Sequence, residues 1–435
     1  MAFATVVSKA TGSTTANAAT HSVNFPAGIT NDEVLMVCFG SDGAPVLVDN
    51  EGRWTKIDGQ EGNGGLVTGC VFAKIADGND GLTVRTPGTN EQASWVSFRI
   101  ANHGGLPVAV SANGSSTNSN PPAITPPWGT QDYLFIAARM GDANVGATGA
   151  PSGYSNLTGV THANTAGASV HTAEKSANAS TEDPGTFTSA TEQWATFTIA
   201  VPPAGITTPK LWAKYYVELD DGGSLATPSF TPVENEKIVV KILTSDADWT
   251  FTDPTGGGLT YTSRGSFTTA QFTRGGLYTA EVGAGPSSMT VSTTIAPASG
   301  PEPSMVVERW RDAKFDATPA VNSPTSGTSG APSSTITTEA NDSVVSWMNG
   351  DWQAIAPGAY AYRGTHTVED GMDDETTTFY AGYYAYTYAP TAGAQTIGLS
   401  APAGQKWTLL AVEIQYQAPP AAVADTTKFF LSAAA

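Results

Sequence analysis

The stretch Asp32-Glu33-Val34-Leu35-Met36-Val37-Cys38-Phe39 decides the fold, because it opens with two acids and continues as a short, wholly apolar run. An apolar run of this length behind a polar start is typical of a fully buried β-strand. The same pattern returns at Asp132, at Glu236 and at Asp342, which is once every 100–106 residues. Repetition at a fixed period indicates a tandem architecture, so we expect four copies of one structural unit.

Each expected unit also has a closing strand, which begins with tryptophan in three of the four. Trp95-Val96-Ser97-Phe98-Arg99-Ile100 and Trp194-Ala195-Thr196-Phe197-Thr198-Ile199 start 63 and 62 positions after their starting acids, and Trp407 stands 65 positions after Asp342. Alternating apolar positions in both stretches are typical of a sandwich strand with one buried face. The third unit matches least well, because its Trp310 is displaced along the strand.

Composition agrees with an all-β fold. Only 14% of the 435 residues are charged, and 46 Gly and 28 Pro are spread along the chain, which disfavours long helices. We predict four tandem antiparallel β-sandwiches, jelly-roll-like and about 100 residues each, in preference to one large barrel. The expected domains are residues 1–104, 105–204, 210–312 and 313–416, followed by a C-terminal tail over 417–435.

The charge balance and the cysteine count limit the partners. A net charge of −19 repels phosphate backbones, so we expect no nucleic-acid binding. The N-terminus lacks a basic, then apolar, leader and the longest apolar runs are about six residues, so we expect neither a signal peptide nor membrane insertion. Cys38 and Cys70 are the only cysteines, and because both stand in apolar runs we favour a buried, reduced pair over a disulfide.

The sequence contains no recognisable catalytic or cofactor-binding motif. There is no His-x-His, no His-Glu-x-x-His, no Gly-x-Ser-x-Gly and no phosphate-binding loop, so we predict a protein that is not an enzyme and holds no cofactor or metal. The histidines are expected on solvated or strand-face positions, as single side chains. They are His21, His103, His162, His171 and His366.

Two acidic segments could bind a cation. Asp77-Gly78-Asn79-Asp80-Gly81 offers oxygen ligands but lacks a bidentate glutamate, so we favour a β-turn over a calcium loop. The run 369–375 places five carboxylates in one expected loop, which we read as solvated, although calcium binding stays open. A polysaccharide depolymerase that uses Asp373, Asp374 or Glu375 is the weakest of our readings, because glycosidase carboxylates usually come from separate strands.

Two clusters of large side chains are candidate contact sites. Tyr380, Tyr384, Tyr386 and Tyr388 share one face of an expected strand, where they could contact a glycan or a protein, although cross-strand packing is the interpretation that we favour. In the tail, the cluster Phe429-Phe430-Leu431 stands where no sandwich would bury it. We predict that this cluster docks on a neighbouring subunit, or that the tail folds back on the fourth unit.

The repeated units resemble virion proteins of tailed bacteriophages. The resemblance lies in Pro26-Ala27-Gly28 before the polar start, in the central Trp54-Thr55-Lys56-Ile57 and in the closing tryptophan strand, and it covers the first two units best. It implies a non-enzymatic structural protein of the virion, assembled in the host cytoplasm, in an external appendage such as the tail tip or fibre. Capsid decoration, a head fibre and a glycan-binding adhesin are the alternatives. The expected partners are other virion proteins, host surface glycans and further copies of the chain, most simply in a trimer.

Overall fold

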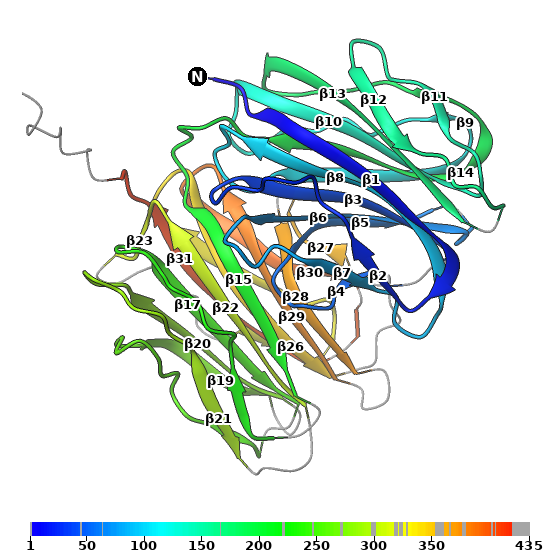
Figure 1. The fold of residues 1–435 in the computed structure, drawn as a ribbon. Helices are drawn as coiled ribbons and strands as arrows, with labels where there is room; N and C mark the ends of the chain where they lie inside the picture. Colours follow the sequence, from blue (N-terminus) through cyan, green and yellow to red (C-terminus); the bar gives the residue numbers. More distant parts are fainter. Residues whose placement is uncertain are drawn as a thin grey trace, which may run out of the picture.

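The computed structural model describes residues 2–419, except for 44–45, 63, 166, 220–221, 246–247, 270–272, 297–301, 317–320, 322–324, 328, 353–360, 365–366, 376–379, 402 and 405. These residues form antiparallel β-sheets and no helix, which confirms the all-β prediction and is compatible with tandem sandwiches (Figure 1). No part of the described chain is a helix that is long and apolar enough to cross a membrane.

The strands fall into four consecutive groups, which we call units one to four. Unit one holds β1 (Thr5–Ala18), β2 (Thr20–Val23), β3 (Val34–Asp42), β4 (Val48–Asp49), β5 (Thr55–Glu61), β6 (Val67–Ile75), β7 (Leu82–Arg85) and β8 (Glu91–Ala101). Unit two holds β9 (Val108–Ser119), β10 (Gln131–Asp142), β11 (Ala147–Gly149), β12 (Ser155–Val160), β13 (Ala168–Ala179) and β14 (Phe187–Val201).

The second half of the chain supplies the other two groups. Unit three holds β15 (Lys210–Glu218), β16 (Ser224–Ala226), β17 (Lys237–Thr244), β18 (Thr250–Phe251), β19 (Thr262–Thr269), β20 (Thr273–Glu281), β21 (Ser292–Ala296) and β22 (Pro303–Arg311). Unit four holds β23 (Ala313–Lys314), β24 (Thr325–Gly327), β25 (Ser333–Thr338), β26 (Ser343–Trp352), β27 (Ala361–Tyr362), β28 (Thr367–Glu375), β29 (Tyr380–Ala389), β30 (Gly393–Ala401) and β31 (Lys406–Tyr416). Whether each unit folds as a separate domain stays a prediction.

The same strand order recurs in every unit. The main sheets run β1-β8-β3-β6-β5, β9-β14-β10-β13-β12, β15-β22-β17-β20-β19 and β24-β31-β26-β29-β28, with β11 also on β14 and β23 also on β31. The central strands β3, β10, β17 and β26 contain the four apolar runs that revealed the period. A three-stranded sheet accompanies the main sheet in units one, three and four: β2-β7-β4, β16-β21-β18 and β25-β30-β27.

In units one, two and four, the closing tryptophan lies against a glycine of the neighbouring strand, which is β1, β9 or β24. Trp95 pairs with Gly12, Trp194 with Gly114 and Trp407 with Gly327. A Cβ atom added to any of these three glycines would come closer than 3.0 Å to the indole ring. The absence of a side chain therefore lets the ring lie flat over the neighbouring strand, which is a recognised use of glycine in sheets.

The polar starts of units one and three hold their closing strands through buried ion pairs. Glu33 accepts two hydrogen bonds from Arg99, both 2.8 Å long. Glu236 accepts from Arg309 at 2.8 Å and from Arg311 at 2.7 Å. The Arg99 guanidinium lowers the pKa of Glu33. In units one and three, the acid that precedes the central strand therefore links this strand to the closing strand.

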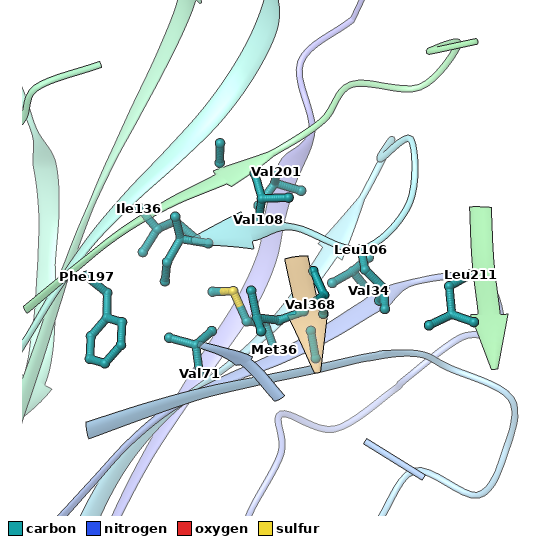
Figure 2. Close-up of a cluster of buried hydrophobic side chains, with 14 of the residues drawn as sticks. Val34, Met36, Val71, Leu106, Val108, Ile136, Phe197, Val201, Leu211 and Val368 are labelled. Carbon is teal, nitrogen blue, oxygen red and sulfur yellow. The ribbon is translucent and has the colours of Figure 1, made fainter. Parts of the chain in front are cut away.

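The main sheets pack against each other in pairs, so the chief layers form between units. Figure 2 shows Met36 and Val71 of unit one facing Ile136 and Phe197 of unit two. The same core cluster contains Val368 of unit four. Main sheets three and four pack in the same way, through β19 on β31 and β20 on β26. This arrangement differs from a row of self-contained sandwiches, because one face of each main sheet is covered by another unit.

Units one and four also join edge to edge. Lys56 of β5 and Glu369 of β28 form the single bridge that makes their two main sheets one eleven-stranded sheet. Their side chains form an ion pair with 2.9 Å between Nζ and Oε1.

The cysteines of this sheet are free and buried, with Cys38 on the face toward unit two and Cys70 on the face toward the three-stranded sheet. Opposite faces keep the two sulfur atoms apart, in agreement with the reduced pair that the sequence favours.

Candidate functional site

A cavity rich in charged side chains lies where units one, three and four meet. Its volume is about 430 Å³, which lies within the range of small-molecule pockets. Strands β4, β5 and β7 supply one side, β15 a second and β28 a third. Its ionisable and aromatic lining residues are Asp49, Glu51, Trp54, Lys56, Phe72, Arg85, Lys214, Tyr216, Glu218 and Glu369. We call this cavity the junction pocket.

Asp49 fixes the turn that forms the pocket wall. Its carboxylate accepts backbone N–H bonds from Glu51 at 2.9 Å and from Trp54 at 2.6 Å, and a third from Arg53. Burial raises the pKa of Asp49 to about 6, against the opposing effect of these hydrogen bonds. Because both oxygens are engaged by the backbone, Asp49 holds the loop and is not an available acid or base.

The other carboxylates of the pocket are also engaged by the protein. Glu369 is paired with Lys56 and accepts a hydrogen bond from the Tyr362 hydroxyl at 3.0 Å. Glu218 accepts from the Tyr216 hydroxyl at 2.6 Å. Trp54 and Phe72 are each only 1% exposed, so their rings form the floor and cannot stack on a ligand. The pocket therefore offers polar contacts at its rim, from Glu218 and the exposed Arg85, and no arranged catalytic pair.

A second charged group, which sequence reasoning missed, lies between the main sheets of units three and four. Lys241 and Glu308 form an ion pair of 2.5 Å with both side chains completely buried. The ammonium also donates to the carbonyl oxygens of Trp347 at 3.3 Å and Ala385 at 3.1 Å. The single lysine within the apolar run of 238–243 is the signal that could have revealed it. This group holds two sheets together.

The tyrosine cluster is buried, which corrects the alternative of a glycan- or protein-binding face and agrees with the packing role that we favoured. Tyr384 and Tyr386 have no exposed surface and Tyr388 is 6% exposed. The Tyr384 hydroxyl lies 2.7 Å from the Ser304 hydroxyl of unit three. The side chain of Tyr380 lies outside the described residues. The three described rings share one face, as predicted, but they pack between units because a second sheet covers that face.

The acidic run 369–375 is a strand and not a loop. It belongs to β28, which pairs with β29 and makes a single bridge to β5. The side chains of Asp373, Asp374 and Glu375 lie outside the described residues, so their role as cation ligands or in a depolymerase stays untested. At 77–81 the ammonium of Lys74 lies 2.7 Å from Asp77 and 3.2 Å from Asp80, in the place where a cation would sit.

Three of the histidines are buried. His21 on β2 and His171 on β13 agree with the strand-face expectation, whereas the buried His162 lies between β12 and β13, on neither a strand nor a solvated position. His21, His162 and His171 are at most 7% exposed, and burial lowers the pKa of His171 to about 4. His103 contacts the backbone oxygen of Asp32 at 2.7 Å, and His366 lies outside the described residues. Within the described ranges, no three His, Cys, Asp or Glu side chains are grouped so that they could hold a metal ion.

The predicted docking cluster Phe429-Phe430-Leu431 also lies outside the described residues.

No family model matches the chain, and no similar protein was found among curated proteins or solved structures. The site must therefore be interpreted from its own chemistry.

Proposed function

We propose that this chain is a non-enzymatic structural protein of a bacteriophage virion, in an external appendage such as the tail tip or fibre. The observation that supports the proposal is that the four main sheets pack against one another with buried faces. The tyrosines of β29 and the Lys241–Glu308 ion pair stabilise this packing from inside. A structural subunit needs a body that holds its shape under load. Capsid decoration or a head fibre would make the same use of this architecture.

The surface of the chain also suits a particle protein. Outward positions of β1 and β9 carry mainly Ser, Thr, Asn and Ala, and the chain is strongly acidic. A net charge far from zero favours solubility. Both strands stand at edges of their sheets, where a further chain could pair. We therefore expect a homo-oligomer, and the resemblance to external phage appendages favours a trimer. Mass photometry that finds only the 44.8 kDa species would contradict an oligomer in solution.

Gold-labelled antibodies on intact particles test the proposal. We expect label at one external position, and its place on head or tail separates the appendage from the decoration alternative. Absence of the protein from purified particles, by labelling and by mass spectrometry of the particle, would end the proposal.

A glycan-binding adhesin remains the second candidate because of the junction pocket. Its volume of about 430 Å³ could hold a short saccharide, and Arg85 and Glu218 stand at its rim. A glycan array with the intact chain and with the Arg85→Ala variant tests this directly. Binding that Arg85→Ala abolishes and that the surface control Lys314→Ala leaves unchanged would support the adhesin, whereas an array without signal would remove it.

A further inference from the structure

A large polar cavity lies in unit three, beside the start of unit four. Its volume is about 690 Å³, which is within the size range of small-molecule pockets. Strands β19 and β20 contribute Arg264 and Thr279, glycine-rich turns at 257–258 and 283–285 also line it, and Phe315 of unit four stands beside Arg264. The surface that the lining residues expose is mainly polar. We call this cavity the unit-three groove.

Arg264 is held in position in this groove. Its Nε donates to the Thr279 hydroxyl oxygen at 2.7 Å, and Thr279 is only 1% exposed. The guanidinium carbon lies 5.8 Å from the centre of the Phe315 ring, which is within the range of a cation–π contact. Among the residues that the structure describes, no acceptor pairs with either terminal nitrogen, Nη1 or Nη2. The planar end of this side chain is therefore oriented by the protein and available to a ligand.

The chain itself shows what an arginine of this kind binds. Arg99 donates from Nε and Nη2 to the two oxygens of Glu33, and both distances are 2.8 Å. In Arg264 the Nε is already used by Thr279, so the edge formed by Nη1 and Nη2 can hold one carboxylate through two hydrogen bonds. Burial lowers the pKa of Arg264, because its charge is partly desolvated, and an anion is bound more strongly there than in water.

The glycine-rich turns add uncharged donors. A Cβ on Gly258, Gly283 or Gly285 would meet nothing within 4 Å, so the peptide groups at these positions border open space. In the described part of the chain, the N–H groups of these three glycines donate to no protein acceptor. Donors therefore predominate at the turns, which suits a ligand that is rich in acceptor oxygens.

Two carboxylates of the groove supply acceptors. The side chains of Glu281 and Asp316 are 60% and 36% exposed, and each also lies near a lysine, at 3.2 and 3.7 Å. Carboxylates accept hydrogen bonds from the hydroxyl groups of a ligand. The same two charges repel a ligand with several negative charges, so they favour a monoanion over phosphate.

We infer that the unit-three groove binds a hydroxylated monocarboxylate of the uronic acid type. The carboxylate lies on Nη1 and Nη2 of Arg264, and the hydroxyl groups bind Glu281, Asp316 and the backbone of the glycine-rich turns. The residues that line this groove are separate from those of the junction pocket. A virion role neither requires nor excludes this site, so the site stands or falls independently of the proposed function.

Saturation-transfer NMR on the full chain tests the site with D-glucuronate as the probe. We expect transfer to glucuronate and at least about tenfold weaker binding of D-glucose, which has the hydroxyl groups but no carboxylate. Inorganic phosphate at the same concentration should not displace glucuronate, because Glu281 and Asp316 repel its second charge. No transfer to glucuronate, equal binding of glucose, or displacement by phosphate would each overturn the inference.

Three variants locate the binding site. Arg264→Gln removes the charge but keeps a polar side chain, and we expect it to weaken glucuronate binding at least about tenfold. Arg274→Gln is the matched control, because Arg274 lies on β20 with its guanidinium 5.5 Å from the Phe251 ring and does not line the groove. Gly283→Trp should also weaken binding, because it places a ring in the groove and leaves Arg264 unchanged.

Circular dichroism should be the same in all three variants, which shows that the fold is retained. Unchanged glucuronate binding in Arg264→Gln or in Gly283→Trp would contradict the proposed site. An equal loss of binding in Arg274→Gln would contradict the assignment of the carboxylate to Arg264.

Discussion

Replacing Lys241 by methionine should strongly destabilise the interface between units three and four. Glu308 would then be left as a fully buried carboxylate without its counter-charge, and breaking a buried pair in this way costs about 3–5 kcal/mol. The carbonyl oxygens of Trp347 and Ala385 would also lose a donor. At about 2–4 °C per kcal/mol for a body of 150–250 residues, the transition of this half should fall by on the order of 10 °C.

The double variant Lys241→Met with Glu308→Gln separates stranded charge from lost packing. The neutral amide can still meet Ser346, which donates to Glu308 at 2.8 Å, and Trp310, whose indole donates at 3.0 Å. We therefore expect the double variant to recover at least about 1 kcal/mol relative to Lys241→Met alone. Trp310 packs in this interface with its ring 5.3 Å from that of Tyr386, so urea unfolding followed by tryptophan fluorescence reports on the interface.

Lys314→Met is the matched control, because its side chain is 44% exposed and its partner Asp316 is 3.7 Å away. Its effect should stay within about 0.5 kcal/mol. A cost below about 1 kcal/mol for Lys241→Met, or a double variant no more stable than the single one, would refute the reasoning that a buried charge is being held by its partner.

Three further predictions follow from other parts of the chain. Gly114→Ala should lower the thermal unfolding temperature, although alanine is usually the better strand residue, because the added Cβ meets the Trp194 ring. Gly81→Ala is the control, because nothing lies within 4 Å of a Cβ at that position. Burial raises the pKa of Asp58 to about 6, so the folded state binds this proton more tightly than the unfolded state does. The free energy of unfolding should therefore fall as the pH rises from about 4 to 6. Asp58→Asn should flatten this slope in unfolding curves measured at several pH values. Burial raises the pKa of both the Cys38 and Cys70 thiols, so neither should react with a thiol reagent at pH 8 until the protein is unfolded, and rapid labelling of native protein would contradict their placement.

The central and closing strands could be predicted because their signals are local. The apolar run of Val34–Phe39 and the alternation after Trp95 each depend on residues that are neighbours in sequence, and both stretches form the expected strands. The glycine opposite each tryptophan carried no recognisable signal, because its partner lies about 80 positions away and becomes apparent only in the register.

The acidic segment was misread for a different reason. Strand β28 forms a full ladder with β29 on one side and only one bridge, Glu369 to Lys56, on the other. Such a strand is close to an edge, where charged side chains are tolerated and even discourage unwanted pairing. Its composition is therefore that of a loop, while its backbone is that of a strand. The packing of the tyrosines was expected but their partners were not, because the sheet that covers them belongs to unit three, about 80–140 residues earlier in the sequence.

The continuous apolar run of the central strands is explained by the pairing of the units. A sandwich strand with one solvated face needs only alternate apolar residues. Every residue from Val34 to Phe39 is instead fully buried, with the even-numbered side chains in the core toward unit two and the odd-numbered ones toward the three-stranded sheet β2-β7-β4. The repeat is about 100 residues long in sequence, yet its central strand is covered on both faces only when two repeats are stacked. The physical unit of this fold is therefore a pair of repeats. The apolar run Val34–Phe39 already indicates this pairing, because an unbroken apolar strand requires a packed layer on each of its two faces.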